Sequence, residues 1–368
     1  MTASTRPVDR LPDFPWDLLH GDRDVAERHP DGLVDLSVGS PVDRVPSAVR
    51  AALADAANAP GYPTVHGTAA VREAYAGWLS RAHGVTGLDP ADVLPTLGSK
   101  ELIAALPAQL GVGAGDIVIV PEIAYPTYEV GALLAGAQVR RADRMVPGGS
   151  GRVPLVWLNS PSNPTGRVLS VAHLAKVVAW GRANGAVVVS DECYLDLGWE
   201  TTPVSVLHPD VCGNDFTGVL AVHSLSKRSN LAGYRAGFVT GDPDLVAELT
   251  ALRRHTGAIM PGPIQAAAAA ALGDDGHVMA QRERYAARRT QLWEAFEGAG
   301  FTITDSEAGL YLWATRAEPA MTSVHWLAER GIMVAPGFFY GPAGAQHFRV
   351  ALTAPDERVA SACARLAG

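Results

Sequence analysis

The middle of the chain alternates between short apolar runs and longer segments with helical spacing, and this alternation constrains the fold more than any other feature. The apolar runs have strand length and are rich in Val and Ile; they lie at 93–97, 117–120, 155–158, 186–189, 219–222 and 236–240. Runs without polar interruption are typical of strands buried on both faces of a mostly parallel sheet. The sequence therefore predicts an α/β layer fold between about residues 90 and 240.

Helical segments separate these runs. Between Thr68 and Gly84, apolar residues recur at 71, 75, 78, 79 and 82, the spacing of one helix face. Thr68 is a suitable N-cap and Gly84 a suitable stop, and Ser170 and Gly185 bound a second segment in the same way. We expect a helix in each segment.

The C-terminal part has a different pattern. A charged helix is predicted over 276–298, followed by strand-like pieces at 301–304, 310–314 and 348–352 and a helix near 323–330. We therefore predict a large domain over 45–272 and a smaller α+β domain formed by 1–44 and 273–368. Glutamates share the charged helix with its arginines, so we expect a solvated face rather than a basic binding face. The arginines are Arg282, Arg284, Arg288 and Arg289.

Composition excludes several classes of protein. The 368 residues include 38 acids and 30 lysines and arginines, a formal charge of −8, which argues against a nucleic-acid partner. No stretch approaches the ~20 apolar residues of a membrane helix, and the acidic first 30 residues contain no visible signal peptide. We expect a cytoplasmic protein without a membrane partner.

The cysteines fit the expected cytoplasmic location, and the cysteines and histidines together bear on whether a metal site is present. Cys193, Cys212 and Cys363 form no CxxC pair, which fits a reducing compartment, and we interpret them as small hydrophobic residues in or near the core. No HExxH motif or close His/Cys cluster appears, so the sequence predicts no metal site.

Polar segments follow four of the apolar runs. In open α/β sheets ligands bind beyond the carboxyl ends of the strands. Four such ends together predict a polar ligand with several functional groups. The segments are 98–101, 159–166, 190–194 and 223–227.

Some of these residues suit a phosphate group. Gly98 and Ser99 open a helix, whose free backbone N–H groups and positive dipole end bind anions. Ser224 and Ser226 add hydroxyl donors, and Arg235 lies close to two glycines in the segment Gly233–Gly237, where its guanidinium can fork onto phosphate oxygens.

Two further residues suit a heterocyclic aldehyde: an amine that can bond to the aldehyde and a carboxylate that can pair with a protonated ring nitrogen. Lys227 lies among these phosphate donors, and a neighbouring cation favours its neutral, nucleophilic form. Asp191 ends a buried strand and needs a partner, which a protonated ring nitrogen would provide. Either residue alone would be unremarkable, a surface lysine or a helix-capping aspartate. Together with the phosphate donors they describe a site for pyridoxal 5′-phosphate.

On these motifs the chain resembles the fold-type I, pyridoxal-phosphate-dependent aminotransferases of class I and II, over essentially its whole length. Within that group it is similar to the actinobacterial N-succinyldiaminopimelate aminotransferases. The segments that carry the resemblance are Asp35–Pro41, Pro121–Gly131, Leu158–Gly166, Ser190–Tyr194, His223–Gly237 and the Asp-Glu-Arg-Val at 356–359. The resemblance implies a three-layer αβα large domain with a mostly parallel sheet, plus a smaller α+β domain.

The resemblance also implies roles for individual residues. The catalytic residues would be Lys227, which carries the cofactor and moves the proton, Asp191 at the ring nitrogen, and Tyr194 at the ring oxygen. The implied cofactor-binding residues are Gly98, Ser99, Lys100, Tyr125, Asn163, Asp191, Tyr194, Ser224, Ser226, Lys227, Arg235 and Tyr62, the last reaching the partner subunit's site. The implied substrate-binding residues are Gly39, Asn163 and Arg349, with Lys100 near a distal substrate group. We also expect the Asn163–Pro164 bond to be cis.

The implied activity is transamination between N-succinyl-LL-2,6-diaminopimelate and a 2-oxo acid, 2-oxoglutarate, in lysine and diaminopimelate biosynthesis, by a homodimer with shared active sites. Two departures leave the amino donor open: Phe338 stands where the group has an acid, and Thr256 where it has a small residue.

Alternatives therefore remain. The chain could act on another amino acid or a specialised-metabolite amine, or serve as a lyase with the same cofactor. A regulator that only binds the cofactor is disfavoured, because about 35 residues precede Leu36, too few for a helix-turn-helix domain. The glycines at 111–115 follow a helix and precede a strand, the reverse of a dinucleotide-binding motif, so we interpret them as a turn.

Overall fold

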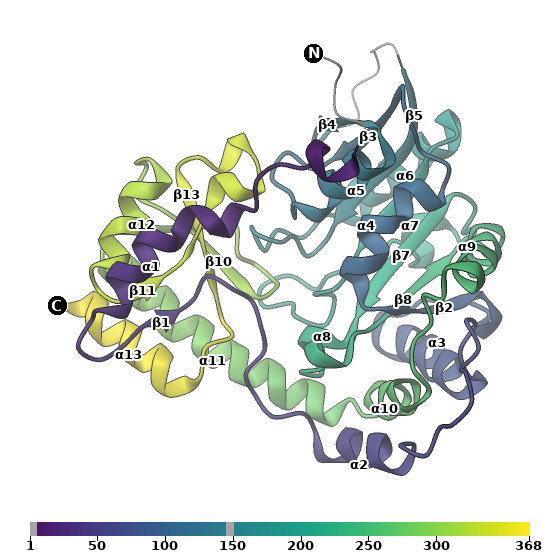
Figure 1. Cartoon of the computed structure of the whole chain (residues 1–368), viewed down its shortest axis with the longest axis horizontal. Coiled ribbons are helices and arrows are strands. Elements are labelled where there is room, and N and C mark those ends of the chain that lie inside the picture. Colours follow the sequence, from purple (N-terminus) through teal and green to yellow (C-terminus); the bar gives the residue numbers. More distant parts are fainter. Residues whose placement is uncertain (1–5, 145–150) are drawn as a thin grey trace.

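A seven-stranded sheet forms the centre of the larger lobe in the computed structural model, which describes residues 6–144 and 151–368 (Figure 1). Its strands, in spatial order, are β2 (Val93–Leu97), β8 (Ala236–Gly241), β7 (Val219–Ser224), β6 (Val187–Asp191), β5 (Arg152–Asn159), β3 (Asp116–Val120) and β4 (Gln138–Arg141). All neighbours from β7 to β4 are parallel, whereas β8 is antiparallel to both β7 and β2. The predicted mostly parallel sheet is confirmed.

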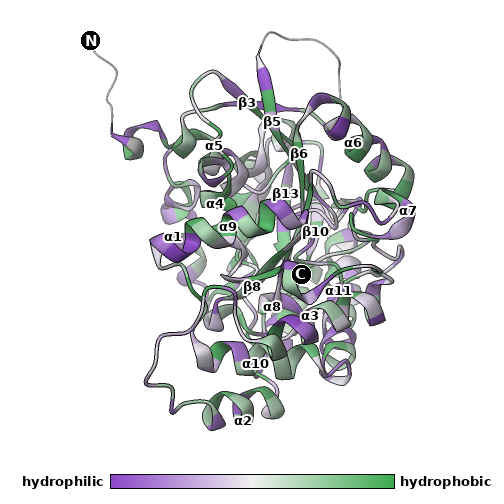
Figure 2. Ribbon diagram, turned by 90° about the vertical axis from the view of Figure 1, so that its right-hand side faces the viewer, coloured by the Kyte–Doolittle hydropathy of each residue, from purple (hydrophilic) through white to green (hydrophobic). Residues whose placement is uncertain are grey.

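Helices cover both faces of this sheet, which explains the uninterrupted apolar runs. Every residue of β3, β7 and β8 is buried. One apolar core joins the sheet to α3 (Ala69–His83), α6 (Val171–Asn184) and α10 (Gly262–Leu272). A second core joins the other face to α4 (Ser99–Gln109), α5 (Thr127–Ala135) and α9 (Pro243–Thr256). Figure 2 accordingly shows strands in hydrophobic colours between helices of mixed colour.

The predicted helix caps are confirmed. Thr68 accepts a 3.3 Å hydrogen bond from the backbone N–H of Val71, and Ser170 accepts one of 3.3 Å from that of His173. Gly84 and Gly185 close the two helices with φ of 65° and 64°, in the left-handed region. The glycines at 111–115 lie between α4 and β3, as expected of a turn.

The smaller lobe is built on a four-stranded antiparallel sheet (Figure 1). Its strands, in spatial order, are β12 (Ala335–Pro336), β13 (His347–Ala351), β10 (Tyr311–Thr315) and β9 (Thr302–Thr304). The helices are α1 (His20–Glu27), α11 (Gly276–Gly298), α12 (Ala320–Ala328) and α13 (Asp356–Ala367). β1 (Val34–Asp35) pairs in parallel with β11 (Ile332–Met333), so the N-terminal segment belongs to the same apolar core. The remaining helices are α2 (Ser47–Asp55), α7 (Pro209–Cys212) and α8 (Leu225–Arg228). The domain boundaries at 45 and 272 stay a prediction.

The prediction of a solvated arginine face on α11 is wrong for Arg288. Arg282 and Arg284 are exposed, but the Arg288 side chain is only 2% exposed. Its guanidinium binds Asp43 through two hydrogen bonds of 2.7 and 2.8 Å and Asp356 through one of 2.6 Å. Helix α13 and the N-terminal segment cover this side of α11, which the charge pattern of α11 alone does not reveal.

None of the helices within the described ranges combines the length and apolar character that crossing a bilayer requires. Within the same ranges, no group of three or more His, Cys, Asp and Glu side chains is arranged to hold a metal ion.

Candidate active site

The structure brings the polar segments together at one edge of the large sheet. Asp191 ends β6, and its register partners are Asn159 on β5 and Val222 on β7. Directly after β7 comes the short helix α8, which carries Lys227. On the far side, β2 leads through Gly98 into α4. The neighbouring strand ends thus deliver the predicted residues to a common rim.

Gly98 and Arg235 form a compact donor site at the N-terminus of α4. Gly98 has a φ of 78°, and a Cβ there would lie 2.3 Å from Nη2 of Arg235, so the guanidinium packs directly against the glycine. Arg235 is exposed and forms no salt bridge with any described residue. Its cation and the free N–H groups of the helix start face the same space, as a phosphate group requires.

The two predicted serines lie at the end of β7. Ser224 caps α8 by accepting a 3.1 Å hydrogen bond from the backbone N–H of Ser226, and its hydroxyl donates one of 2.9 Å to the Ser226 hydroxyl. Gly237 pairs with Ser224 across the sheet, and a Cβ on Gly237 would lie 2.9 Å from the backbone nitrogen of Ser99. The serines, the start of α4 and Arg235 therefore adjoin one another.

Asp191 is a buried carboxylate without a cationic partner among the described side chains. It accepts hydrogen bonds of 2.8 Å from the Tyr128 hydroxyl and 3.1 Å from the backbone N–H of Cys193. Burial raises the pKa of Asp191, and the hydrogen bonds from Cys193 and Tyr128 only partly oppose this. A cationic ring nitrogen would supply the missing charge. The sequence did not predict Tyr128 as a site residue; it lies three residues after Tyr125, and its ring stacks on Trp157 with the ring centres 4.9 Å apart.

Lys227 is half-buried, and its Nζ donates a hydrogen bond to the backbone carbonyl of Gly39. Burial is the largest cause of its lowered pKa, and the charges of Arg349 and Arg235 lower it further. The predicted shift toward a neutral amine is confirmed in direction, although burial rather than a neighbouring cation is the main cause.

Arg349 joins the two lobes. From β13 it donates a 2.8 Å hydrogen bond to Oδ1 of Asn163 and one of 2.6 Å to the backbone carbonyl of Ser37. Its guanidinium carbon lies 4.0 Å from the centre of the Tyr311 ring. The side chain is buried, yet none of the described carboxylates forms a salt bridge with it.

Tyr311 is a site residue that sequence reasoning missed. Its hydroxyl lies 3.1 Å from that of Tyr194. A Cβ on Gly39 would lie 2.2 Å from the same hydroxyl, so only glycine fits at position 39. No sequence signal marks Tyr311, because it reaches the site only when β10 pairs with β13. Burial raises the pKa of Tyr194 well above its ordinary value and that of Tyr125 to about 12, so both are neutral donors near pH 7.

Other predicted residues lie at the periphery. Lys100 is exposed in the first turn of α4, and Tyr62 is fully exposed between α2 and α3. Thr256 is exposed at the end of α9, and Phe338 is half-buried against Phe339 at 5.2 Å. The peptide bond before Pro164 is cis, as predicted, and a second cis bond, before Pro161, was not predicted.

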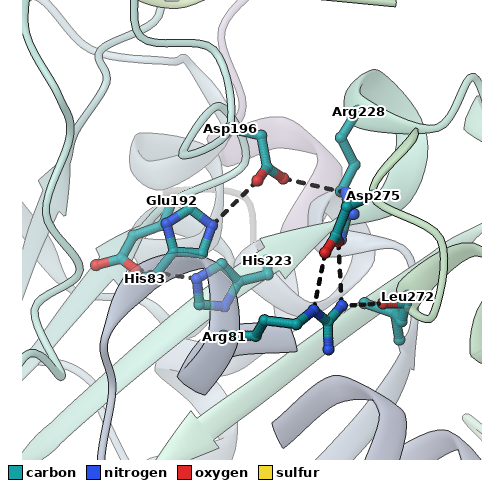
Figure 3. Close-up of polar contacts among 8 residues, drawn as sticks. All are labelled: Arg81, His83, Glu192, Asp196, His223, Arg228, Leu272 and Asp275. Atoms are coloured by element: carbon teal, nitrogen blue, oxygen red, sulfur yellow. Dashed lines mark hydrogen bonds and ion pairs between the residues drawn. The ribbon is translucent and has the colours of Figure 1, made fainter. Parts of the chain in front are cut away.

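Buried polar contacts support the rim from the opposite face of the sheet (Figure 3). Glu192, next to Asp191, lies 3.0 Å from His223, whose other ring nitrogen lies 2.6 Å from the Tyr75 hydroxyl. Glu192 also accepts a 2.7 Å hydrogen bond from the backbone N–H of Val206. These contacts hold the ends of β6 and β7 together.

A second buried cluster surrounds α8 (Figure 3). Asp196 forms ion pairs of 3.0 Å with His83 and 3.1 Å with Arg228, the residue after Lys227. The Arg228 guanidinium also lies 4.7 Å from the centre of the Trp78 ring. The helix that carries Lys227 is thereby fixed to α3.

A family model described as "Aminotransferase class I and II" matches residues 31–366. The chain belongs to the class I and II aminotransferases. It is 62% identical over 356 residues to "Probable aminotransferase Rv1178" of Mycobacterium tuberculosis, covering 97% of this chain and 85% of that protein. It is 58% identical over 356 residues to "4-dedimethylamino-4-oxo-anhydrotetracycline transaminase OxyQ" of Streptomyces rimosus, covering 97% and 99%.

Among solved structures, the "probable N-succinyldiaminopimelate aminotransferase" from Thermus thermophilus matches with a TM-score of 0.86 and 29% identity, over 96% of this chain and 99% of that one. The predicted fold-type I architecture is confirmed, and aminotransferases of this family and fold depend on pyridoxal phosphate.

The residues present fit this cofactor. Gly98 and Arg235 would bind the phosphate in a space that a Cβ on Gly98 would fill, Asp191 is a buried carboxyl without a cationic partner among the described side chains, and Lys227 is a half-buried amine with a lowered pKa. When bound, pyridoxal phosphate supplies an aldehyde that bonds to amines and a ring that withdraws electrons from the substrate α-carbon.

Proposed function

We propose that this aminotransferase transfers the amino group of N-succinyl-LL-2,6-diaminopimelate to 2-oxoglutarate. The observation that carries the proposal is the state of Arg349: a buried cation, hydrogen-bonded only to neutral groups, beside the predicted cofactor site. Burying a charge without a counter-ion is costly, so an anionic ligand is the expected partner. Both proposed substrates carry a carboxylate next to the reacting carbon, and one arginine serves both.

Lys227 and Asp191 take the catalytic roles in this proposal. A lysine with a lowered pKa is a competent nucleophile and, once released from the cofactor, a competent base for the substrate α-proton. Asp191 is a buried carboxyl that would ionise against the ring nitrogen and keep a proton there. Tyr194 and Asn163 donate to the ring oxygen, and Tyr125 stacks on the ring.

The choice of N-succinyl-LL-2,6-diaminopimelate as the amino donor rests on fewer observations than the carboxylate site does. The motifs resemble succinyldiaminopimelate aminotransferases, and the matching Thermus structure bears that name. Lys100 lies one residue after Ser99 in α4 and is exposed, so its amine is available to a distal carboxylate of a long donor.

A second candidate donor is a specialised-metabolite amine. The 58% identical Streptomyces protein is named for a tetracycline intermediate, and Phe338 supplies an apolar side chain where the succinyldiaminopimelate group has an acid. A lyase reaction is the third possibility, and its products differ from those of transamination.

The test is a donor screen on the holoenzyme that follows formation of pyridoxamine phosphate by absorbance. Succinyl-diaminopimelate, glutamate, aspartate, aromatic amino acids and a polycyclic amine are compared, with keto-acid products identified by mass spectrometry. Lys227→Ala is the control, and it should lose both the borohydride-trapped cofactor adduct and the half-reaction. Failure of succinyl-diaminopimelate alone would reject the donor, whereas full activity of Lys227→Ala would reject the mechanism.

We also propose a homodimer in the cytoplasm. The support is Tyr62, whose ring is fully exposed on one chain although the family resemblance assigns it to the partner's phosphate site. An active monomer at all protein concentrations would contradict this.

A further inference from the structure

Tyr340 is buried beside Arg349 with an unused hydroxyl. It ends the 3₁₀ turn Gly337–Tyr340 and has no exposed surface. Its ring centre lies 5.0 Å from the Arg349 guanidinium carbon and 6.2 Å from the centre of the Trp313 ring. Within residues 6–144 and 151–368, no atom forms a hydrogen bond with the Tyr340 hydroxyl.

The backbone fixes this position. The carbonyl of Tyr340 accepts a 2.8 Å hydrogen bond from the N–H of Ala124, the residue before the predicted ring-stacking Tyr125. The backbone of Tyr340 is therefore held next to the segment that carries Tyr125, and its side chain is fully buried there.

A phenylalanine would fill the same space without burying a polar group. A buried donor without a partner is destabilising, and such groups in native proteins call for an explanation. Arg349 has the same property at Nε, which is buried and lacks a partner among the described residues. Two neighbouring side chains thus carry unused donors, and the rings around the Arg349 guanidinium, Tyr311 at 4.0 Å and Tyr340 at 5.0 Å, belong to neutral side chains.

A carboxylate ligand would accept hydrogen bonds from both the Tyr340 hydroxyl and the Arg349 guanidinium. Its two oxygens provide about four acceptor positions, enough for an arginine fork and one phenol. Burial raises the pKa of Tyr340 far above its ordinary value, so the phenol keeps its proton near pH 7 and can only donate to an anion.

We propose that Tyr340 is a substrate-binding residue that donates a hydrogen bond to the carboxylate held by Arg349, in both half-reactions. The inference rests on the proposed function only in requiring a carboxylate substrate, whichever amine is the true donor.

The experiment compares Tyr340→Phe with Tyr285→Phe. Tyr285 is equally buried, but its hydroxyl already donates to Asn230 at 3.3 Å and lies outside the site. Three quantities are measured on each holoenzyme: the melting midpoint without ligand, the dissociation constant for glutarate by calorimetry, and KM and kcat for 2-oxoglutarate with the best donor of the screen. Arg349→Lys is measured in the same way, and the glutarate binding that it loses is the part that depends on the Arg349 site.

For Tyr340→Phe we expect an unchanged or raised melting midpoint, at least fivefold weaker glutarate binding, and a similar rise in KM with kcat within about twofold. For Tyr285→Phe we expect a lowered midpoint and unchanged binding. Wild-type glutarate affinity in Tyr340→Phe would overturn the proposal, because the Tyr340 hydroxyl would then form no hydrogen bond with the bound carboxylate. A lowered midpoint in Tyr340→Phe would overturn it too, since the hydroxyl would have a structural partner. Glutarate binding is read without turnover, so a wrong donor assignment leaves this test intact.

Discussion

Nη1 of Arg349 donates a 2.8 Å hydrogen bond to Oδ1 of Asn163, and this contact joins the antiparallel sheet of the small lobe to the loop that follows β5 in the large one. Nη2 of the same guanidinium binds the carbonyl of Ser37. One planar side chain therefore fixes three segments that are far apart in the sequence and still lacks an anionic partner among the residues described.

Replacing Arg349 with lysine should weaken the binding of both substrates. An ammonium group cannot hold Asn163, Ser37 and a carboxylate in the fork geometry of a guanidinium. Losing one charge-assisted hydrogen bond, about 1.5–3 kcal/mol, corresponds to a rise in KM of roughly 10- to 100-fold. Steady-state kinetics with varied donor and acceptor check this. An effect on one substrate only would show that the two do not share Arg349.

Gly98→Ala should weaken cofactor binding more than its backbone strain explains. The new Cβ would lie 2.3 Å from Arg235, displacing the guanidinium from the phosphate site. Gly111→Ala, at a φ of 70° with no atom within 4 Å, is the matched control for strain alone. Absorbance titration of the apoenzyme should give at least ~10-fold weaker binding for Gly98→Ala, the effect of about 1.4 kcal/mol. Equal cofactor affinity of the two variants would show that Arg235 does not bind the phosphate group.

Asp191→Asn should raise the stability of the apoenzyme and lower the turnover of the holoenzyme. Burial raises the pKa of Asp191, so the folded chain favours the protonated carboxyl, and that contribution to stability is lost as the pH rises through the raised pKa. Ionisation of this unpaired carboxyl as the pH rises destabilises the apoenzyme, and asparagine cannot ionise. Its Oδ1 can accept from the backbone N–H of Cys193 while its Nδ2 donates to the Tyr128 oxygen, which reverses the second hydrogen bond.

We therefore expect the Asp191→Asn apoenzyme to melt on the order of 2 °C above wild type at pH 7, with the difference vanishing below about pH 4. Turnover of the holoenzyme should fall by about 100-fold or more. Scanning calorimetry across pH and single-turnover assays test the two parts; a variant with wild-type turnover would show that the ring nitrogen does not depend on Asp191.

Asp196→Asn should destabilise the fold and leave the chemistry largely intact. Burial alone would raise the pKa of Asp196, but Arg228 and His83 lower it to about 2. Breaking this buried pair leaves Arg228 uncompensated, at a cost of about 3 kcal/mol in the free energy of unfolding. Because the folded pKa is depressed, the contribution is present above about pH 4 and is lost as the pH falls through 2.

Urea denaturation at pH 7 and at pH 3 measures this loss. Asp210→Asn is the control, because its carboxylate is 74% exposed beside His208 and should contribute less than about 0.5 kcal/mol. Equal stability of the two variants would mean that the Asp196 cluster contributes nothing to the fold.

The sequence by itself determined six of the seven strands of the large sheet, the helix caps and the residues at the strand ends, but not β4, whose sequence Gln-Val-Arg-Arg is polar. Uninterrupted apolar runs and capping residues act over a few neighbours, and parallel strands must end at a common edge, so Gly98, Asp191 and Lys227 could be brought together without coordinates.

Only the tertiary structure decided what surrounds Arg349 and which charges are buried. Tyr311 and Tyr340 reach Arg349 through the pairing of β10, β12 and β13, and Arg288 is buried because Asp43 and Asp356 converge on α11. The reason is physical: local patterns fix the period of an element and its apolar face, whereas the partner of a polar side chain depends on segments hundreds of residues away, which meet only after the sheets have packed.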